Sequence, residues 1–98
     1  MGKVYSQTLS EHRRLTILKY LVETTGYSSN VSILTDVCNG FAVTSTRDEV
    51  ATDARWLAGK GFATVSDQGD FMIVTIEPSG AEVAKGLRVV DGIKRPGP

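Results

Sequence analysis

Apolar residues recur at helical spacing near the start of the chain. Leu15, Leu18 and Leu21 follow one another at intervals of three residues within residues 10–24, which places them on one face of an α-helix. Ser10 has the kind of side chain that caps a helix N-terminus. The pattern therefore predicts a first helix over residues 10–24.

A second, shorter helix is predicted over residues 30–39. Val31 and Leu34 share one side of it, and the polar residues 28–30 precede it. Polar side chains of this kind cap free backbone N–H groups at a helix start. Gly40 follows as a residue that ends helices.

The third predicted helix, over residues 45–58, has an amphipathic pattern with Val50, Ala54 and Leu57 on one face. Ser45 and Asp48 have the spacing of a capping box, in which a hydroxyl and a carboxylate satisfy the first free N–H groups. The helix is therefore expected to begin at Ser45. Its outward face is expected to carry Glu49, Thr52 and Trp56, with Asp53 on the flank.

After this helix the period of the apolar pattern changes from helical to strand-like. Residues 62–66 and 71–76 are rich in β-branched and aromatic side chains, and the turn-forming residues 67–70 separate them. They predict a β-hairpin whose second strand, apolar on both faces, is covered on both sides. Pro78 then suits the first turn of a short fourth helix that ends at Lys85.

Three helices, a two-stranded hairpin and a short C-terminal helix define an α+β fold class with the winged-helix arrangement. The chain has 98 residues, of which 41% are apolar, enough for one core. We expect an N-terminal arm over residues 1–9, a folded domain over 10–86 and a basic, Pro- and Gly-containing tail over 87–98. Termini of this composition stay mobile unless a partner holds them.

Catalytic and metal-binding chemistry is not expected in this chain. It contains one cysteine, Cys38, and one histidine, His12, too few for a metal site built on paired cysteines. Cys38 is expected to be buried, and His12 to lie beside Arg13 and Arg14 on an exposed helical turn. We therefore expect no enzyme, no cofactor and no metal ion. Without a signal peptide or a long apolar segment, the cytoplasm is the expected location and no membrane is involved.

Residues 44–62 look like the recognition helix of winged helix-turn-helix proteins running into the wing, and this resemblance covers residues 10–86. A narrower resemblance is to the small ArsR-like winged-helix proteins of Mu-like bacteriophages and prophages. It rests on residues 14–21, 55–57 and 83–96. The resemblance implies a DNA-binding transcriptional regulator, or an accessory to DNA handling, in a bacterial host. ArsR sensors bind metal through cysteine pairs, which this chain lacks.

In winged-helix DNA binders the third helix lies in the major groove and the hairpin tip reaches a neighbouring groove or the backbone. Carried over to this chain, the resemblance implies contacts from the third helix, from the wing tip and from basic residues near both ends. The nucleic-acid-binding candidates are Arg13, Arg14, Ser45, Thr46, Arg47, Thr52, Arg55, Gln68, Lys94 and Arg95.

The charge distribution favours a different class of partner. Residues 31–82 contain eight acidic side chains against three basic ones, although the formal net charge of the chain is zero. Duplex affinity depends strongly on neutralising phosphates with Lys and Arg. The alternative to a protein that binds double-stranded DNA is therefore a protein-interaction module, which retains the winged-helix scaffold but does not read DNA.

Three aromatic residues are candidates for a protein interface, because exposed aromatic side chains often anchor such contacts. They are Trp56, Phe41 and Tyr27. Trp56 could instead pack on the base of the hairpin. If the aromatic residues form one patch, a homodimer is expected.

Overall fold

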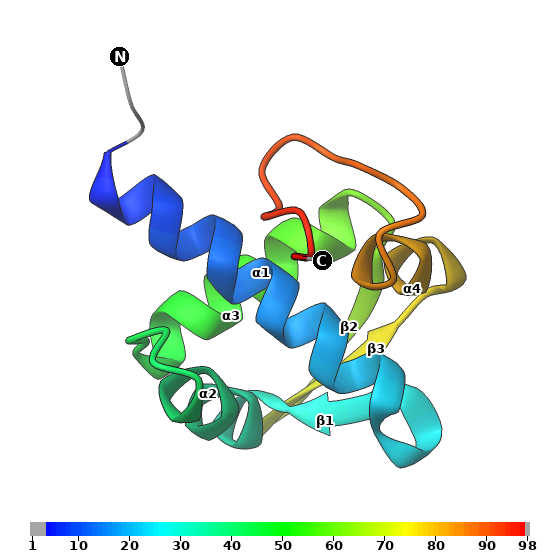
Figure 1. Cartoon of the computed structure of the whole chain (residues 1–98). Coiled ribbons are helices and arrows are strands. Elements are labelled where there is room, and N and C mark those ends of the chain that lie inside the picture. Colours follow the sequence, from blue (N-terminus) through cyan, green and yellow to red (C-terminus); the bar gives the residue numbers. More distant parts are fainter. Residues whose placement is uncertain (1–3, 98) are drawn as a thin grey trace.

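The computed structural model describes residues 4–97, which form four α-helices and a three-stranded antiparallel sheet (Figure 1). The elements along the chain are α1 (Tyr5–Glu23), the 3-10 turn η1 (Thr25–Tyr27), β1 (Ser28–Asn30), α2 (Val31–Gly40), α3 (Arg47–Gly59), β2 (Ala63–Gln68), β3 (Phe71–Ile76) and α4 (Pro78–Ala84). The predicted α+β class is confirmed.

The first helix starts earlier than the apolar pattern indicated. α1 begins at Tyr5, so most of the expected arm over residues 1–9 is helical, while residues 1–3 lie outside the described part of the chain. The side chain of Gln7 caps this end by accepting a hydrogen bond from the N–H of Val4 at 3.3 Å. Residues 4–7 are exposed, and an exposed turn leaves no apolar period to detect.

The capping box of α3 lies one residue later than predicted. Thr46 Oγ1 accepts from the N–H of Glu49 at 3.1 Å, and Glu49 Oε1 accepts from the N–H of Thr46 at 2.9 Å. Thr46, not Ser45, is therefore the N-cap. The reason is that the Ser45 hydroxyl is buried and bonded elsewhere. At the other end Gly61, with φ +83°, closes the helix.

The sheet contains one strand that the sequence did not predict. The strand order is β1-β3-β2, and β1 pairs with β3 in antiparallel register, Ser28 opposite Thr75 and Asn30 opposite Ile73. Its three residues are all polar and had been assigned to the cap of α2. Asn30 is both the last residue of β1 and the N-cap of α2, since its side chain accepts a hydrogen bond from the N–H of Ile33 at 2.8 Å.

The predicted hairpin is present as β2 and β3. β2 runs two residues further than predicted, to Gln68, because Gly69 with φ +72° allows a tighter turn. Only one face of β3 is well covered: Met72 and Val74 are buried, whereas Phe71 is 57% exposed. The expectation of a strand covered on both sides is wrong.

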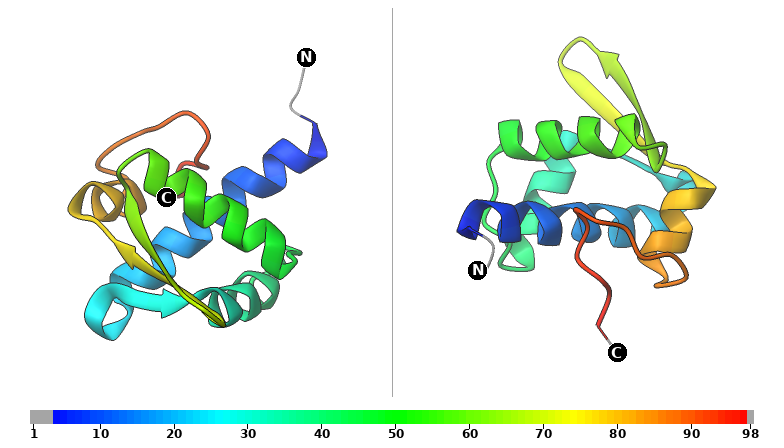
Figure 2. Two further views of the ribbon diagram at one scale, coloured as in Figure 1. Left: turned by 180° about the vertical axis from the view of Figure 1, so that it is seen from behind. Right: turned by 90° about the horizontal axis from the view of Figure 1, so that it is seen from above.

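The helices pack around one core, with the hairpin on its outer edge. Seen from above in Figure 2, the hairpin projects beyond α3, while α1, α4 and the C-terminal segment lie on the opposite side. The largest fully buried side chains come from α1, α2, α3, β3 and α4; they include Ile17, Leu18, Leu21, Leu34, Val50, Leu57, Val74 and Val83. α3 is thus held from behind by α1 and is flanked by the hairpin.

Candidate functional site

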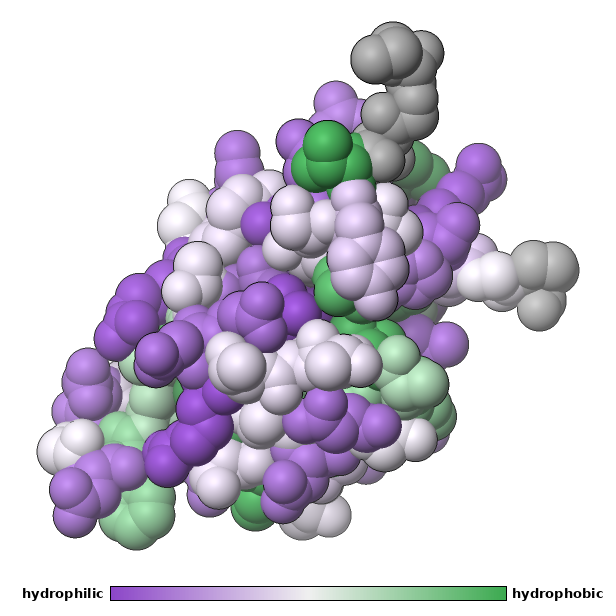
Figure 3. All heavy atoms as spheres, turned by 90° about the vertical axis from the view of Figure 1, so that its left-hand side faces the viewer, coloured by the Kyte–Doolittle hydropathy of each residue, from purple (hydrophilic) through white to green (hydrophobic). Residues whose placement is uncertain are grey.

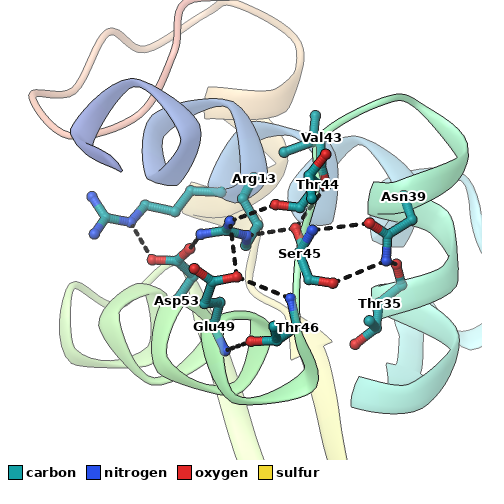
Figure 4. Close-up of polar contacts among 10 residues, drawn as sticks. Arg13, Thr35, Asn39, Val43, Thr44, Ser45, Thr46, Glu49 and Asp53 are labelled. Carbon is teal, nitrogen blue, oxygen red and sulfur yellow. Dashed lines mark hydrogen bonds and ion pairs between the residues drawn. The ribbon is translucent and has the colours of Figure 1, made fainter. Parts of the chain in front are cut away.

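A buried arginine joins the inner side of α3 to α1. Arg13 and Asp53 are only 3% and 2% exposed, and Arg13 Nη1 donates to Asp53 Oδ2 at 2.9 Å (Figure 4). Arg13 Nε donates to Ser45 Oγ at 2.7 Å and Nη2 to the Thr44 carbonyl at 3.1 Å. Arg13 is therefore not on an exposed turn, and Asp53 is not on the outward flank of α3, as the sequence had suggested.

The same network fixes the loop between α2 and α3. Ser45 Oγ donates to the Val43 carbonyl at 2.7 Å. The Asn39 side chain accepts from the Ser45 N–H at 2.9 Å and donates to the carbonyls of Ser45 and Thr35, both at 3.0 Å. Across residues 4–97, every buried side-chain nitrogen and oxygen has a hydrogen-bond partner. Ser45 is therefore a structural residue, with its hydroxyl already bonded on both sides.

Arg14 links the same carboxylate to the C-terminal segment. Its Nε donates to Asp53 Oδ1 at 2.9 Å, and its Nη1 donates to the Gly92 carbonyl at 2.8 Å. The guanidinium lies 4.0 Å from the ring centroid of Trp56, and Lys60 Nζ lies 5.4 Å from the same centroid. Both geometries are cation–π contacts. Trp56 therefore packs against Arg14 and, partly buried, against the hydrophobic core.

The C-terminal segment, which was expected to be a free tail, packs against Arg14 and Trp56. Ile93 is buried, and the Lys94 N–H donates to the Glu11 carbonyl at 3.1 Å. Gly92 has φ +94°, and a Cβ at that position would come within 2.7 Å of the Trp56 ring. Glycine is required there on both counts, so the contact between residue 92 and Trp56 is specific.

The outward side of α3 presents a different set of side chains. Arg47, Thr52 and Arg55 are exposed, as is the cap residue Thr46. Arg55 Nη2 lies 3.7 Å from Asp67 Oδ2 on β2, with both side chains more than half exposed. The structure therefore brings Thr46, Arg47, Thr52 and Arg55 onto one helix, beside the hairpin that carries Gln68.

Formal charges separate this outward side from the hairpin tip. The exposed charged side chains of α3 are Arg47, Asp48, Glu49 and Arg55. Arg55 shares its charge with Asp67 on β2, and Glu49 lies near the buried Arg13. At the tip, Asp67 and Asp70 flank the turn, which has no basic residue of its own. The outward side of α3 thus carries basic and acidic side chains in equal number, whereas the hairpin tip carries acidic ones.

Two titratable groups near the site have shifted pKa values. A hydrogen bond from the Thr46 backbone, with a smaller contribution from the charge of Arg13, lowers the pKa of Glu49. Its carboxylate also lies 3.6 Å from Arg13 Nη2. Burial raises the pKa of the Cys38 thiol to about 11. Cys38 is buried as predicted, and its thiol is therefore protonated and inert near neutral pH.

The remaining candidates lie away from the outward side of α3. Lys94 and Arg95 are exposed, but they follow Ile93 on the side of the molecule opposite the hairpin (Figure 2). Phe41 is 73% exposed and Tyr27 57%. Figure 3 shows the end of the molecule where α1 and α3 begin: hydrophilic side chains dominate it, and hydrophobic ones form small separate patches.

Two further findings concern residues 4–97. No group of three or more His, Cys, Asp and Glu side chains in this range is arranged to hold a metal ion. None of its helices combines the length and apolar character needed to cross a membrane.

Comparison with known proteins places the chain in a phage family. No protein-family model matches it. It is 38% identical over 90 residues to the uncharacterized protein gp26 of Escherichia phage Mu, an alignment that covers 92% of this chain and 93% of gp26. The chain belongs to the same family as Mu gp26. The resemblance to small proteins of Mu-like phages is confirmed at this level.

Proposed function

We propose that this chain is a winged-helix protein that binds double-stranded DNA through the outward side of α3, as a phage transcriptional regulator or an accessory to DNA handling. The order of elements supports the winged-helix assignment, since α3 follows α2 closely and leads directly into a hairpin. The observation that carries the DNA proposal is the internal neutralisation of Asp53 by Arg13 and Arg14. It leaves Arg47, Thr52 and Arg55 exposed on the outward side, together with Asp48.

Because of this neutralisation, the number of acidic residues in the segment 31–82 does not give the charge of the outward side of α3. Asp53 is buried against two arginines, and Glu49 is bonded within its own cap. Glu82 is paired with Arg88 at 2.9 Å, on the α4 side of the molecule. Asp53 and Glu82 are therefore not on the outward side of α3, and the charge of the half-exposed Glu49 is offset by Arg13 at 3.6 Å. The negative count of the segment thus overstates the charge of the surface that DNA would meet.

Duplex binding measured against salt concentration tests the proposal. Each phosphate contact by Lys or Arg contributes about one to the slope of log affinity against log salt. Arg47→Ala and Arg55→Ala should therefore each weaken binding and each reduce that slope by about one. Arg95→Ala is the matched control, because the same substitution on the opposite side should leave both quantities unchanged.

Two outcomes would overturn the DNA proposal. One is the absence of duplex binding by the native chain at low salt. The other is binding that Arg47→Ala and Arg55→Ala leave intact while Arg95→Ala or Lys94→Ala abolishes it, which would assign the contact to the C-terminal segment.

A protein partner at the hairpin is the second candidate, and a specific observation favours it. Phe71 is 57% exposed next to Asp70 and opposite Gln68 in the β2–β3 register. An acidic tip repels phosphates, whereas a basic protein surface with an apolar pocket would accommodate both the charge and the ring. A photo-reactive residue at Phe71 should then crosslink to a protein in a nuclease-treated lysate of phage-infected cells. The same group at Ile33, an exposed apolar residue of α2, should not.

A further inference from the structure

The C-terminal half of α1 forms an exposed ridge between two grooves. Lys19 and Glu23 line both of them. The Phe41 groove, of about 600 Å³, lies toward α2 and is lined by His12, Leu15, Thr16, Lys19, Tyr20, Glu23, Thr24, Phe41 and Val43. The Tyr27 groove, of about 520 Å³, lies toward α4 and includes Val22, Tyr27, Ile76, Pro78 and Ala81. A ridge beside grooves of this size is a surface that another helix can pack against.

The charged residues of the ridge are arranged so that the ridge is complementary to the same ridge of a second copy. Lys19 and Glu23 stand one helical turn apart on the same side of α1. Within residues 4–97 neither takes part in an ion pair, although four acidic side chains elsewhere in this range do. In an antiparallel pair of α1 helices related by a two-fold axis near residue 21, Lys19 of each copy faces Glu23 of the other. Glu77 and Lys85, which also line the Tyr27 groove, cancel in charge.

We propose that a second copy of this chain docks on α1, with the ridge of each copy against the ridge of the other and two reciprocal Lys19–Glu23 pairs. Phe41 and Tyr27, 73% and 57% exposed at the edges of the grooves, supply the large apolar anchors that such an interface needs. A two-fold contact uses one surface twice, so each pair occurs twice in the dimer.

This surface lies on the opposite side of the core from the hairpin (Figure 2). A dimer through α1 leaves both α3 surfaces open. The proposal therefore holds whether or not the chain binds DNA, and it can be tested without any nucleic acid.

Charge exchange between the two positions is the test, with the dimer dissociation constant measured by analytical ultracentrifugation. Lys19→Glu places like charges opposite each other twice and should weaken the dimer by about tenfold or more. Glu23→Lys should do the same. Lys60→Glu is the matched control, because it makes the same charge change at the end of α3 and should leave dimerisation unchanged. Circular dichroism of each variant verifies that the helices are formed.

Mixing the two single variants gives a signature that only this geometry produces. In a heterodimer of Lys19→Glu with Glu23→Lys, both contacts join opposite charges again, so the mixture should dimerise although each variant alone is weakened. The variant carrying both changes should also recover. A native chain that stays monomeric at high concentration would overturn the proposal, as would a dimer that Lys19→Glu does not weaken or a mixture that does not recover.

Discussion

The arginines of α1 and those of α3 use the same side chain in opposite ways. Arg13 and Arg14 are held by buried or half-buried hydrogen bonds to Asp53, at 2.9 Å each. Arg47 and Arg55 are exposed, and the ion pair that Arg55 makes is long and open to solvent. A guanidinium held by buried hydrogen bonds is fixed in place by the fold, whereas an exposed one contributes little to stability. The comparison shows that burial, not residue type, separates structural from available charge.

The largest effect is expected from breaking the buried network. Asp53→Ala leaves Arg13 buried without its nearest counter-charge, and loss of one member of such a pair costs about 3–5 kcal/mol in the free energy of unfolding. Urea unfolding of the native chain and the variant measures this loss of stability. Asp48→Ala, in the exposed first turn of the same helix, should cost at most about 1 kcal/mol, the size of a carboxylate's interaction with the helix dipole. A loss below about 1 kcal/mol for Asp53→Ala would mean that the network is not structural.

A second variant separates the charge from the packing. Arg13→Met combined with Asp53→Leu removes both partners of the pair and replaces them with apolar groups of similar size. Because the most deeply buried charge, that of Arg13, is removed together with the carboxylate, and Arg14 keeps partial access to solvent, the double variant should lose less stability than Asp53→Ala alone.

An intermediate effect is expected at Gly92. Gly92→Ala places a Cβ close to the Trp56 ring and forces an L-residue to φ +94°, which should cost about 1–3 kcal/mol in stability or detach the segment. Trp56 is the only tryptophan, so its fluorescence reports the change directly. Gly97→Ala is the control, since nothing lies within 4 Å of a Cβ there. An unchanged emission spectrum in Gly92→Ala would contradict the described contact.

The smallest effect is expected on the outward side of α3. A double-mutant cycle with Arg55→Ala and Asp67→Ala should give a coupling free energy of at most about 0.5 kcal/mol, since both side chains are more than half exposed. The coupling should fall further as salt is added. A coupling above about 2 kcal/mol would show that Arg55 belongs with the structural arginines.

Much of the fold could be predicted from the sequence, because most elements leave a local signal. Apolar spacing identified the helices, and Gly61 and Gly69 occur where a left-handed backbone is needed. The missed strand β1 is three polar residues long, and its pairing with β3 is a contact between distant segments. No local pattern in residues 28–30 could reveal it.

Less of the candidate site could be predicted from the sequence, because its contacts also join distant segments. Helical periodicity placed Asp53 at the edge of the apolar stripe of α3 and could not show that Arg13, 40 residues away, would cover it. Asn39 looked like a simple helix end, although its side chain holds the next loop. A carboxylate at a stripe edge, together with arginines at the matching height of another helix, is the one signal that could have suggested the network.

The bond from Arg14 to the Gly92 carbonyl joins residues 78 positions apart. A contact between residues so far apart requires the intervening segments to be brought together first, and this has an entropic cost. We therefore expect the cover over the Trp56 ring to close late in folding, after a stage in which Asp53 has its α1 partners but the indole is still exposed to solvent.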